Sequence, residues 1–494
     1  MSLRLSLLKG ASVLTVSQAL VAACTFFRNV IIARHIDTEN FGVASTFALT
    51  ITLVEMTSHL ALDRVLVQDR EGGRDDMLAS AHLLQFLKGL LIGAIQFAIA
   101  APIAHLFGID DKVWAFQLLA VVHVLTGFMH FDFVVRQRRM EFLPTAIFDA
   151  LPQILTVMVA LAATLVFEDY RVMLAVILLQ TLMQVALSHL LARRPYRWAL
   201  RRQLARRKLI FAWPLLVNGI LMLGIFQGDR FIIGSFYDMQ TLGWYSVAFS
   251  LCLLPTLLFA KLSGNLLMPI LAQSRDDKAF YERCCQYALI GCFSFAVVMV
   301  VFFTVAGYGL VHVSFGEQYL QAAEVIAWLT GMQALRVVRM APSIIANSQG
   351  HTKNIMIANI FRSTGLGLAV ALGIRGVPVT WIAATGIAGE AIALAVSVSL
   401  VQLGDGKGRF VGTLLQLALT GTLICGLFIS LIPPLLPAPD DSLALSFLQL
   451  AIGAVSALLA AALLALSQAP VRKELLALLR PTERAARVAA EAGR

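Results

Sequence analysis

Charged residues are scarce in this 494-residue sequence: Asp, Glu, Lys and Arg make up 14% of it. An average soluble domain contains about 25%. Hydrophobic residues make up 59%, and the mean hydropathy is +0.80. This composition excludes a soluble globular protein, because no soluble core could hide so much apolar sequence. In a bilayer only helices and closed barrels satisfy their backbone polar groups, and the apolar runs are continuous rather than alternating, which favours helices.

Motifs of catalysis and of metal binding are also lacking. The sequence has no P-loop, no His/Cys cluster with metal-ligand spacing and no nucleophile elbow. The six cysteines form no disulfide framework, and we interpret them as reduced. We therefore expect a transporter that is not an enzyme, with no cofactor and no metal. Its energy would come from an ion gradient, the membrane potential or consumption of the product.

Apolar windows of about 20 residues, the length that spans a bilayer, predict fourteen transmembrane helices. The first, after Arg4 and Lys9, is read as a spanning helix and not as a cleaved signal, because its apolar run continues past Cys24. The predicted helices cover residues 11–34, 41–62, 79–104, 113–135, 143–167, 172–192, 209–236, 241–272, 284–307, 320–346, 354–374, 377–401, 410–432 and 443–467.

The distribution of Lys and Arg predicts the orientation of these helices. With the N-terminus inside, 28 of the 39 basic residues fall in inside segments, and four fall outside: Arg34, Lys112, Arg171 and Arg375. Basic residues favour the cytoplasmic side, so both termini are predicted to be cytoplasmic. The linker 193–208 carries eight basic residues and the tail 468–494 carries six. Each is either an interfacial amphipathic helix on an anionic leaflet or a solvated loop.

An internal repeat with an offset of 201 residues relates the start of the chain to its middle. It has five identities, which pair residues 31, 32, 37, 42 and 45 with 232, 233, 238, 243 and 246. The seventh helix thus repeats the first, and six is even, so the two copies run in parallel orientation. Parallel repeats related by an axis along the membrane normal are a transporter architecture. The repeat predicts two lobes, 1–192 and 209–401, with the last helices, in 402–467, appended.

Ionisable residues inside the predicted helices are the candidate functional groups, because they are costly in lipid and usually face a partner or a wet cavity. The basic ones are Arg28, Lys88, Arg230, Lys261, Arg336, Arg339 and Arg362. Lys88, Lys261 and Arg362 lie near predicted cytoplasmic ends, so snorkelling to the interface is an alternative for them. Among the acids, Glu55, Asp229 and Glu390 could bind a coupling ion. The alternative for Asp229 and its neighbour Arg230 is that each forms a structural salt bridge with another helix.

The excess of buried basic groups indicates an anionic cargo, because Arg binds phosphate and carboxylate in fork geometry. We hypothesise that Arg28, Arg230, Arg336 and Arg339 line one shared cavity that opens to one side of the membrane at a time. Transport that is unchanged in all four alanine variants would contradict this.

Four segments in this order resemble the polysaccharide-transport flippases of the multidrug/oligosaccharidyl-lipid/polysaccharide exporter superfamily. They are residues 33–42 (ARHIDTENFG), 228–234 (GDRFIIG), 242–248 (LGWYSVA) and 347–353 (NSQGHTK). The resemblance implies two six-helix lobes in a pseudo-twofold V around a central cavity. It also implies a flippase that moves oligosaccharide repeat units linked to undecaprenyl pyrophosphate from the cytoplasmic to the periplasmic leaflet, for surface polysaccharide (O-antigen of lipopolysaccharide) or exopolysaccharide. The expected location is the bacterial inner membrane.

Other functions remain open at this point. One is a peptidoglycan-precursor flippase, which also has fourteen helices. Another is a cation-coupled small-molecule exporter of the same superfamily, whose drug exporters have twelve helices and lack the final pair. A membrane polymerase or glycosyltransferase is the alternative from another class, although the short predicted outside loops weigh against it. The expected partners are the lipid-linked glycan, the bilayer, a polysaccharide polymerase and a chain-length regulator, and no nucleic acid.

Overall fold

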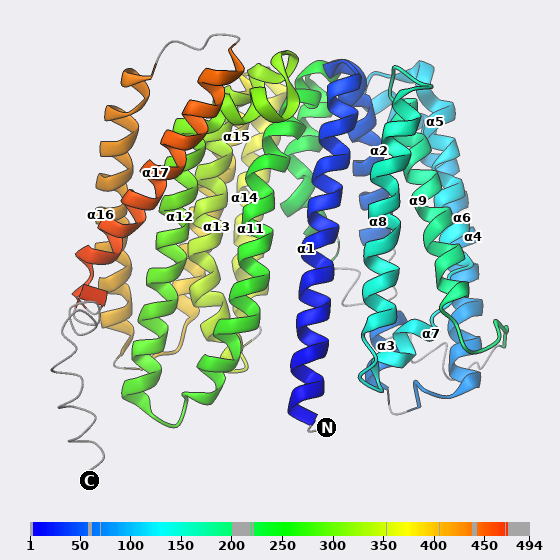
Figure 1. Ribbon diagram of the computed structural model, residues 1–494, viewed down its shortest axis with the longest axis horizontal. Helices are drawn as coiled ribbons and strands as arrows, with labels where there is room; N and C mark the ends of the chain where they lie inside the picture. Colours follow the sequence, from blue (N-terminus) through cyan, green and yellow to red (C-terminus); the bar gives the residue numbers. More distant parts are fainter. Residues whose placement is uncertain are drawn as a thin grey trace. The chain divides into compact units, whose positions relative to one another are not determined.

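The computed structural model describes residues 3–57, 62–69, 71–199, 219, 222–351, 353–404, 406–436, 442–469 and 471–472, and within these ranges it contains helices and no β-strand (Figure 1). Up to residue 190 the helices are α1 (Leu3–His35), α2 (Thr38–Thr57), α3 (Leu62–Gln68), α4 (Asp75–Leu106), η1 (Asp110–Lys112), α5 (Val113–Leu118), α6 (Ala120–Gly127), α7 (Asp132–Gln137), α8 (Leu143–Thr164) and α9 (Arg171–Leu190).

The later helices follow a helical stretch at residues 222–236. They are α11 (Met239–Gln273), α12 (Lys278–Phe315), η2 (Glu317–Ala322), α13 (Ala323–Ser348), α14 (Lys353–Ile374), α15 (Val379–Leu400), α16 (Gly406–Leu431), η3 (Pro433–Leu435) and α17 (Leu443–Ser467). The prediction of an all-α membrane protein is confirmed.

Ten of the described helices are long and apolar enough to span a membrane: α1, α4, α8, α9, α11, α12, α14, α15, α16 and α17. The other four predicted spans correspond to α2, to the series α5–α7, to residues 222–236 and to α13. The protein is thus a multi-pass membrane protein, and its helices are compatible with fourteen spans. The count itself stays a prediction.

The fourth predicted span, 113–135, is not one continuous helix but is split into α5, α6 and α7. At the break after α6, side chains accept backbone N–H groups. Ser188 Oγ accepts from His130 at 3.0 Å, and His82 Nε2 accepts from Phe131 at 3.3 Å. His130 Nδ1 accepts from Asp132 at 3.1 Å. A broken helix is tolerated in a membrane bundle where other groups take over its freed backbone bonds, and these side chains do so.

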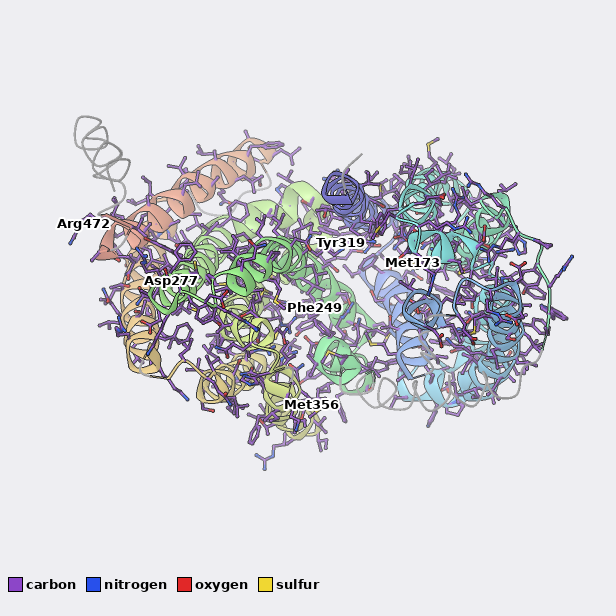
Figure 2. All side chains as sticks on the ribbon, turned by 90° about the horizontal axis from the view of Figure 1, so that it is seen from below. Met173, Phe249, Asp277, Tyr319, Met356 and Arg472 are labelled. Carbon is purple, nitrogen blue, oxygen red and sulfur yellow. The ribbon has the colours of Figure 1, made fainter. Side chains whose placement is uncertain are left out.

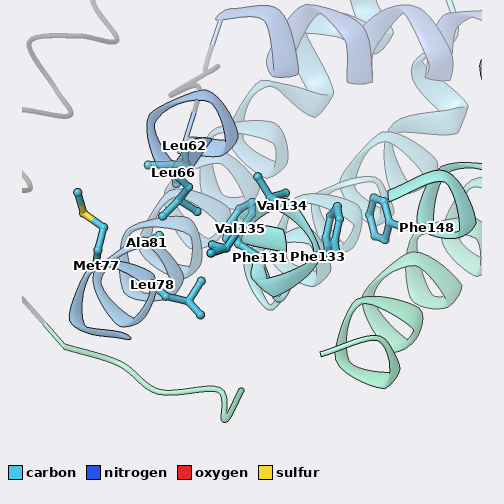
Figure 3. Packing of buried hydrophobic residues seen from close by; sticks show 10 residues of the cluster. All are labelled: Leu62, Leu66, Met77, Leu78, Ala81, Phe131, Phe133, Val134, Val135 and Phe148. Atoms are coloured by element: carbon cyan, nitrogen blue, oxygen red, sulfur yellow. The ribbon is translucent and has the colours of Figure 1, made fainter. Parts of the chain in front are cut away.

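The short helices α3 and α7 are held by an apolar cluster together with α4 and α8 (Figure 3). Leu66 of α3 is fully buried in it, and Phe133 of α7 stacks on Phe148 of α8 with ring centroids 4.2 Å apart. Burial of apolar side chains therefore fixes two helices that are too short to cross the membrane.

The described part of the predicted linker, residues 193–199, is not helical and packs on α4. Trp198 stacks on Phe86 at 4.6 Å, and Tyr196 stacks on His82 at 4.4 Å. Residues 200–208 lie outside the described residues, as do 470 and 473–494 of the tail. An interfacial helix in those parts of the linker and tail stays a prediction.

Contacts divide the chain into two compact units, residues 1–250 with 366–382 and residues 251–365 with 383–494. We call them the first and the second unit. They are defined by packing alone, and the predicted lobes 1–192 and 209–401 stay a prediction.

The internal repeat has matching local structure in its two copies. Asp37 Oδ1 accepts the backbone N–H of Asn40 at 2.7 Å at the start of α2. Asp238 Oδ1 accepts that of Thr241 at 2.7 Å at the start of α11. A side-chain acceptor at this position satisfies a free donor of the first helical turn. Both aspartates are therefore helix caps at equivalent positions.

The repeated glycines contact each other. A Cβ added to Gly42 would lie 1.8 Å from the carbonyl oxygen of Met239, and one added to Gly243 would lie 2.0 Å from that of Thr38. Met239 and Thr38 are themselves equivalent by the offset of 201. Such reciprocal contacts are the mark of local two-fold symmetry, and they require glycine because backbone meets backbone.

Candidate functional site

A cavity of about 410 Å³ lies within the first unit. This volume falls in the range of about 300–1,000 Å³ that is typical of ligand pockets. Met173 of α9 lines it, and Figure 2 labels this residue together with Phe249 of α11. The polar side chains that line it are Thr25, Arg28, Asn29, Ser45, Thr52, Glu55, Thr126, Gln153, Gln180, Thr181, Gln184, Arg230, Ser246 and Ser250.

Arg28 lines the cavity from α1, and its Nη1 donates a hydrogen bond to Gln180 Oε1 on α9 at 2.8 Å. Its side chain is half-buried. This bond to a neutral amide oxygen orients the guanidinium group without cancelling its charge. Arg28 therefore presents a net positive charge to the cavity.

Arg230 lines the cavity from the helical residues 222–236. Its guanidinium carbon lies 4.5 Å from the ring centroid of Phe249, within the range of a cation–π contact, and it hydrogen-bonds to Gln227. The neighbouring Asp229 accepts a hydrogen bond from Tyr245 Oη at 2.9 Å. The acid is thus held by α11, and an aromatic ring together with a neutral amide positions the base.

Four polar atoms of the cavity lining are buried and have no hydrogen-bond partner among the described residues: Arg28 Nε, Asn29 Oδ1, Arg230 Nε and Ser246 Oγ. Two of them are guanidinium donors, one is a hydroxyl, and one is an amide acceptor. A buried polar atom left unsatisfied costs about 1–3 kcal/mol. This cluster favours a ligand that accepts hydrogen bonds as an anion and also carries hydroxyl groups.

Glu55 of α2 lines the same cavity and attracts Lys88 of α4 electrostatically. The two residues carry opposite charges, so they offset each other. The net charge of the cavity lining therefore comes from Arg28 and Arg230.

A second group of ionisable residues lies in the second unit around Glu390, which is fully buried on α15. Its carboxylate is 2.7 Å from Arg336 Nε, 3.1 Å from Arg339 Nε and 2.8 Å from Arg362 Nε. Arg339 also donates to Asn359 Oδ1 at 3.3 Å. Each of the three arginines is less than a tenth exposed. One carboxylate is therefore shared by three guanidinium groups.

Close packing of α14 on α15 allows this arrangement. A Cβ on Gly365 would lie 2.9 Å from the carbonyl oxygen of Thr385, and one on Gly389 would lie 2.8 Å from that of Arg362. Small residues let transmembrane helices approach closely. Here they bring Glu390 within reach of an arginine on the neighbouring helix.

The predicted site residues thus fall into separate groups. Arg28, Arg230 and Glu55 line the cavity of the first unit, and Arg336 and Arg339 bind Glu390 in the second unit. A single cavity shared by all four arginines stays a prediction.

The alternatives left open for three site residues have mixed outcomes. Arg362 binds Glu390 and does not snorkel, whereas Lys261 is exposed on α11. Asp229 binds Tyr245 from the neighbouring helix.

Sequence reasoning missed the neutral polar groups of the cavity. Gln180 and Gln184 are four residues apart on α9 and so share a helix face, and Gln153 lies in the middle of α8. A search of the apolar helices for amide side chains would have found these residues, because an amide in lipid needs a partner as a charge does.

Comparison with known proteins identifies the family. A family model described as "Polysaccharide biosynthesis protein" matches residues 31–324, which is more than half of the chain. An uncharacterized membrane protein in the cps region of Klebsiella pneumoniae is 19% identical over 281 residues, which cover 56% of this chain and 58% of that protein. The chain thus matches little more than half the length of this relative.

Solved structures give the fold. The lipid II flippase MurJ in an inward closed conformation superposes with a TM-score of 0.70 at 14% identity, covering 91% of this chain and 98% of that chain. An inward-facing multidrug resistance MATE family transporter of the MOP superfamily gives 0.59 at 14% identity, with coverages of 79% and 95%. The chain belongs to the polysaccharide biosynthesis protein family, and it has the fold of these membrane transporters.

Proposed function

We propose that this protein is a flippase that moves oligosaccharide repeat units linked to undecaprenyl pyrophosphate from the cytoplasmic to the periplasmic leaflet. Family membership supports a role in polysaccharide synthesis, and the fold supports transport without a covalent step. The product would serve surface or exopolysaccharide assembly. The protein would lie in the inner membrane with both termini in the cytoplasm, beside a polymerase and a chain-length regulator.

The observation that carries this proposal is the polarity of the cavity in the first unit. Arg28 and Arg230 face it with guanidinium donors that no described residue satisfies. Such donors fit the oxygens of a pyrophosphate. The amides and hydroxyls of the lining, among them Gln153 and Gln184, fit the hydroxyl groups of a sugar. The combination matches the head group of a lipid-linked glycan.

Alternating access would move this head group across the bilayer. The lobes 1–192 and 209–401 would exchange the side on which the cavity is open, as in repeat-based transporters. Three arginines would take part in this change of access through their contacts with Glu390: Arg336, Arg339 and Arg362.

Translocation in reconstituted vesicles tests the proposal. The purified protein is incorporated into liposomes with a fluorescent glycan linked to undecaprenyl pyrophosphate, and a membrane-impermeant glycosidase reports which leaflet holds the glycan. We expect the wild-type protein to expose the inner-leaflet glycan to the enzyme and the double variant R28A/R230A to leave it protected. Protection that is equal in wild-type and protein-free vesicles would contradict the proposal.

A peptidoglycan-precursor flippase is the second candidate, favoured by the TM-score of 0.70 with the lipid II flippase MurJ. The same vesicles loaded with a lipid-linked peptidoglycan precursor separate the two functions. Movement of the precursor alone would select this candidate.

A cation-coupled exporter would use Glu55, Asp229 or Glu390 as its ion ligand. In the same vesicles, transport that stops when the ion gradient is collapsed would favour ion coupling.

A further inference from the structure

An apolar groove of about 650 Å³ runs between α1 and α8 in the first unit. Ser17 and Ala146, which are 5% and 7% exposed, form its floor. The larger side chains beside them are open, with Val16 66% and Ile154 40% exposed. The groove is therefore a long depression between two rows of apolar side chains.

Hydrogen bonds between α1 and α8 fix the floor of this groove. Ser17 Oγ donates to the carbonyl oxygen of Ala146 at 3.1 Å. On the neighbouring face of α1, Gln18 Nε2 donates to Asp149 Oδ2 at 3.0 Å. Because these bonds and the small floor residues set the distance between the helices, the groove is preformed.

The groove and the polar cavity follow one another on the same two helices. On α8, Gln153 lines the cavity and the next residue, Ile154, lines the groove. On α1, the groove reaches Leu20 and the cavity begins at Thr25. Five residues of helix correspond to about 7.5 Å. A ligand that fills both sites must have an anionic, hydrogen-bonding head directly joined to an apolar chain.

We propose that this groove binds the prenyl chain of the lipid whose anionic head group occupies the cavity. The inference rests on the proposed function and extends it, because it assigns a site to the part of the substrate that stays in the membrane. Lipid tails are as apolar as leucine, so the chain gains no hydrophobic free energy by leaving the bilayer lipid. The groove instead contributes packing contacts and a fixed direction for the chain.

Photocrosslinking in the intact protein tests the assignment. The probe is a disaccharide pyrophosphate on an undecaprenyl chain that carries a diazirine in its first isoprene units. We expect crosslinks at residues 13–20 of α1 and 146–154 of α8, and we expect excess unlabelled probe to suppress them. A phospholipid with a diazirine in its acyl chain should not label these segments preferentially.

A groove-filling variant, A150W, gives a second measurement, because Ala150 lines the groove. We expect its affinity for the long-chain probe to fall by about tenfold, which is 1.4 kcal/mol. Its affinity for the same disaccharide pyrophosphate on a short water-soluble chain should stay within about twofold of wild type. The matched control is L419W on α16, where Leu419 is 64% exposed.

The outcomes separate the two proposals. If the short-chain head-group probe does not bind the wild-type protein, the proposed function fails. If it binds but the prenyl-chain probe labels other helices, the groove assignment alone is overturned. The same holds if that probe labels α1 and α8 no better than the phospholipid does. The mapping uses the unaltered protein, so it decides the question even if A150W does not fold.

Discussion

The two units of this protein use buried arginines in opposite ways. In the first unit, Arg28 and Arg230 face a cavity, and their partners there are neutral amides and an aromatic ring. In the second unit, Arg336 and two further arginines surround the single carboxylate of Glu390. The same residue type in apolar helices therefore lines a cavity in one unit and forms an internal ion cluster in the other.

The difference lies in what neutralises the charge. A buried ion is costly unless it is paired, and inside the protein Glu390 supplies one negative charge that three guanidinium groups share. Arg28 is bonded to a neutral amide, and Arg230 is attracted by the neighbouring carboxylate of Asp229, which Tyr245 also binds. We propose that a bound anion completes the neutralisation of these two arginines. Removing a charge should therefore affect stability in the second unit and transport in the first.

The largest effect is expected for E390Q, which keeps the side-chain volume and removes the shared negative charge. Breaking a buried ion pair by removing one partner costs about 3–5 kcal/mol. Thermal unfolding of the purified protein in detergent measures the loss as a lower Tm. The control is E168Q, because Glu168 is exposed. If E390Q and E168Q unfold at the same temperature, the carboxylate is not needed to hold the arginines and the contrast fails.

R28A and R230A are expected to show the reverse pattern, with transport lost and Tm nearly unchanged. Hydrogen bonds to charged groups are worth about 1.5–3 kcal/mol, or about tenfold to a hundredfold in initial rate. R28K should recover part of the lost transport rate, because lysine keeps the positive charge but lacks the forked donors of the guanidinium group. The vesicle assay measures the rates, and R375A, an exposed arginine in the turn before α15, is the control. A drop in Tm similar to that of E390Q would remove the distinction between the two units.

The positions of the helices and of their arginines could be predicted from the sequence, but the pairing of these arginines could not. The apolar windows predicted the helices, and the rarity of charge in them singled out the arginines that line the cavity or surround Glu390, because lipid penalises every ionisable side chain alike. Pairing is different, since it depends on which helices are neighbours. Glu390 and Arg336 are 54 residues apart, and nothing in either segment shows that they meet.

The break in the fourth predicted span was missed for a similar reason. A hydropathy window averages over residues 128–131, whereas the break depends on acceptors from other segments, among them Ser188 and His82. The repeat was more informative. Its identities at Asp37 and Gly42 are the positions where a cap and a backbone contact restrict the choice of residue.

A smaller effect, on packing without charge, is expected from G42A and G243A. Each added methyl group would meet a backbone carbonyl oxygen at 1.8 Å or 2.0 Å, and overpacking costs about 1–3 kcal/mol. The double variant should lose less than the sum, because both changes separate the same pair of helices. Tm measures this, with G264A as the control, since nothing lies within 4 Å of a Cβ there. Additive losses would show that the two glycines do not share one contact.

The smallest effect is expected from pH at His130, in the loop between α6 and α7. Its Nδ1 accepts from the backbone N–H of Asp132, and its Nε2 lies 3.0 Å from the carbonyl oxygen of Arg194 in the linker. This geometry fits a neutral ring protonated at Nε2. A second proton, on Nδ1, would remove the hydrogen bond that Nδ1 accepts from the backbone N–H of Asp132. The rings of His82, His189 and Tyr196 surround it.

Nδ1 of His130 accepts this bond only while it carries no proton, so the form in which the linker packs on His130 binds fewer protons than the form in which the linker is released. The stabilisation of the packed linker is therefore lost as the pH falls. Between about pH 7.5 and about pH 5.5, hydrogen exchange of residues 193–199, corrected for the intrinsic rate, should become faster. The dependence should vanish in H130Q and persist in H105Q, because the His105 side chain is 83% exposed. An equal pH response in H130Q would show that His130 is not the group responsible.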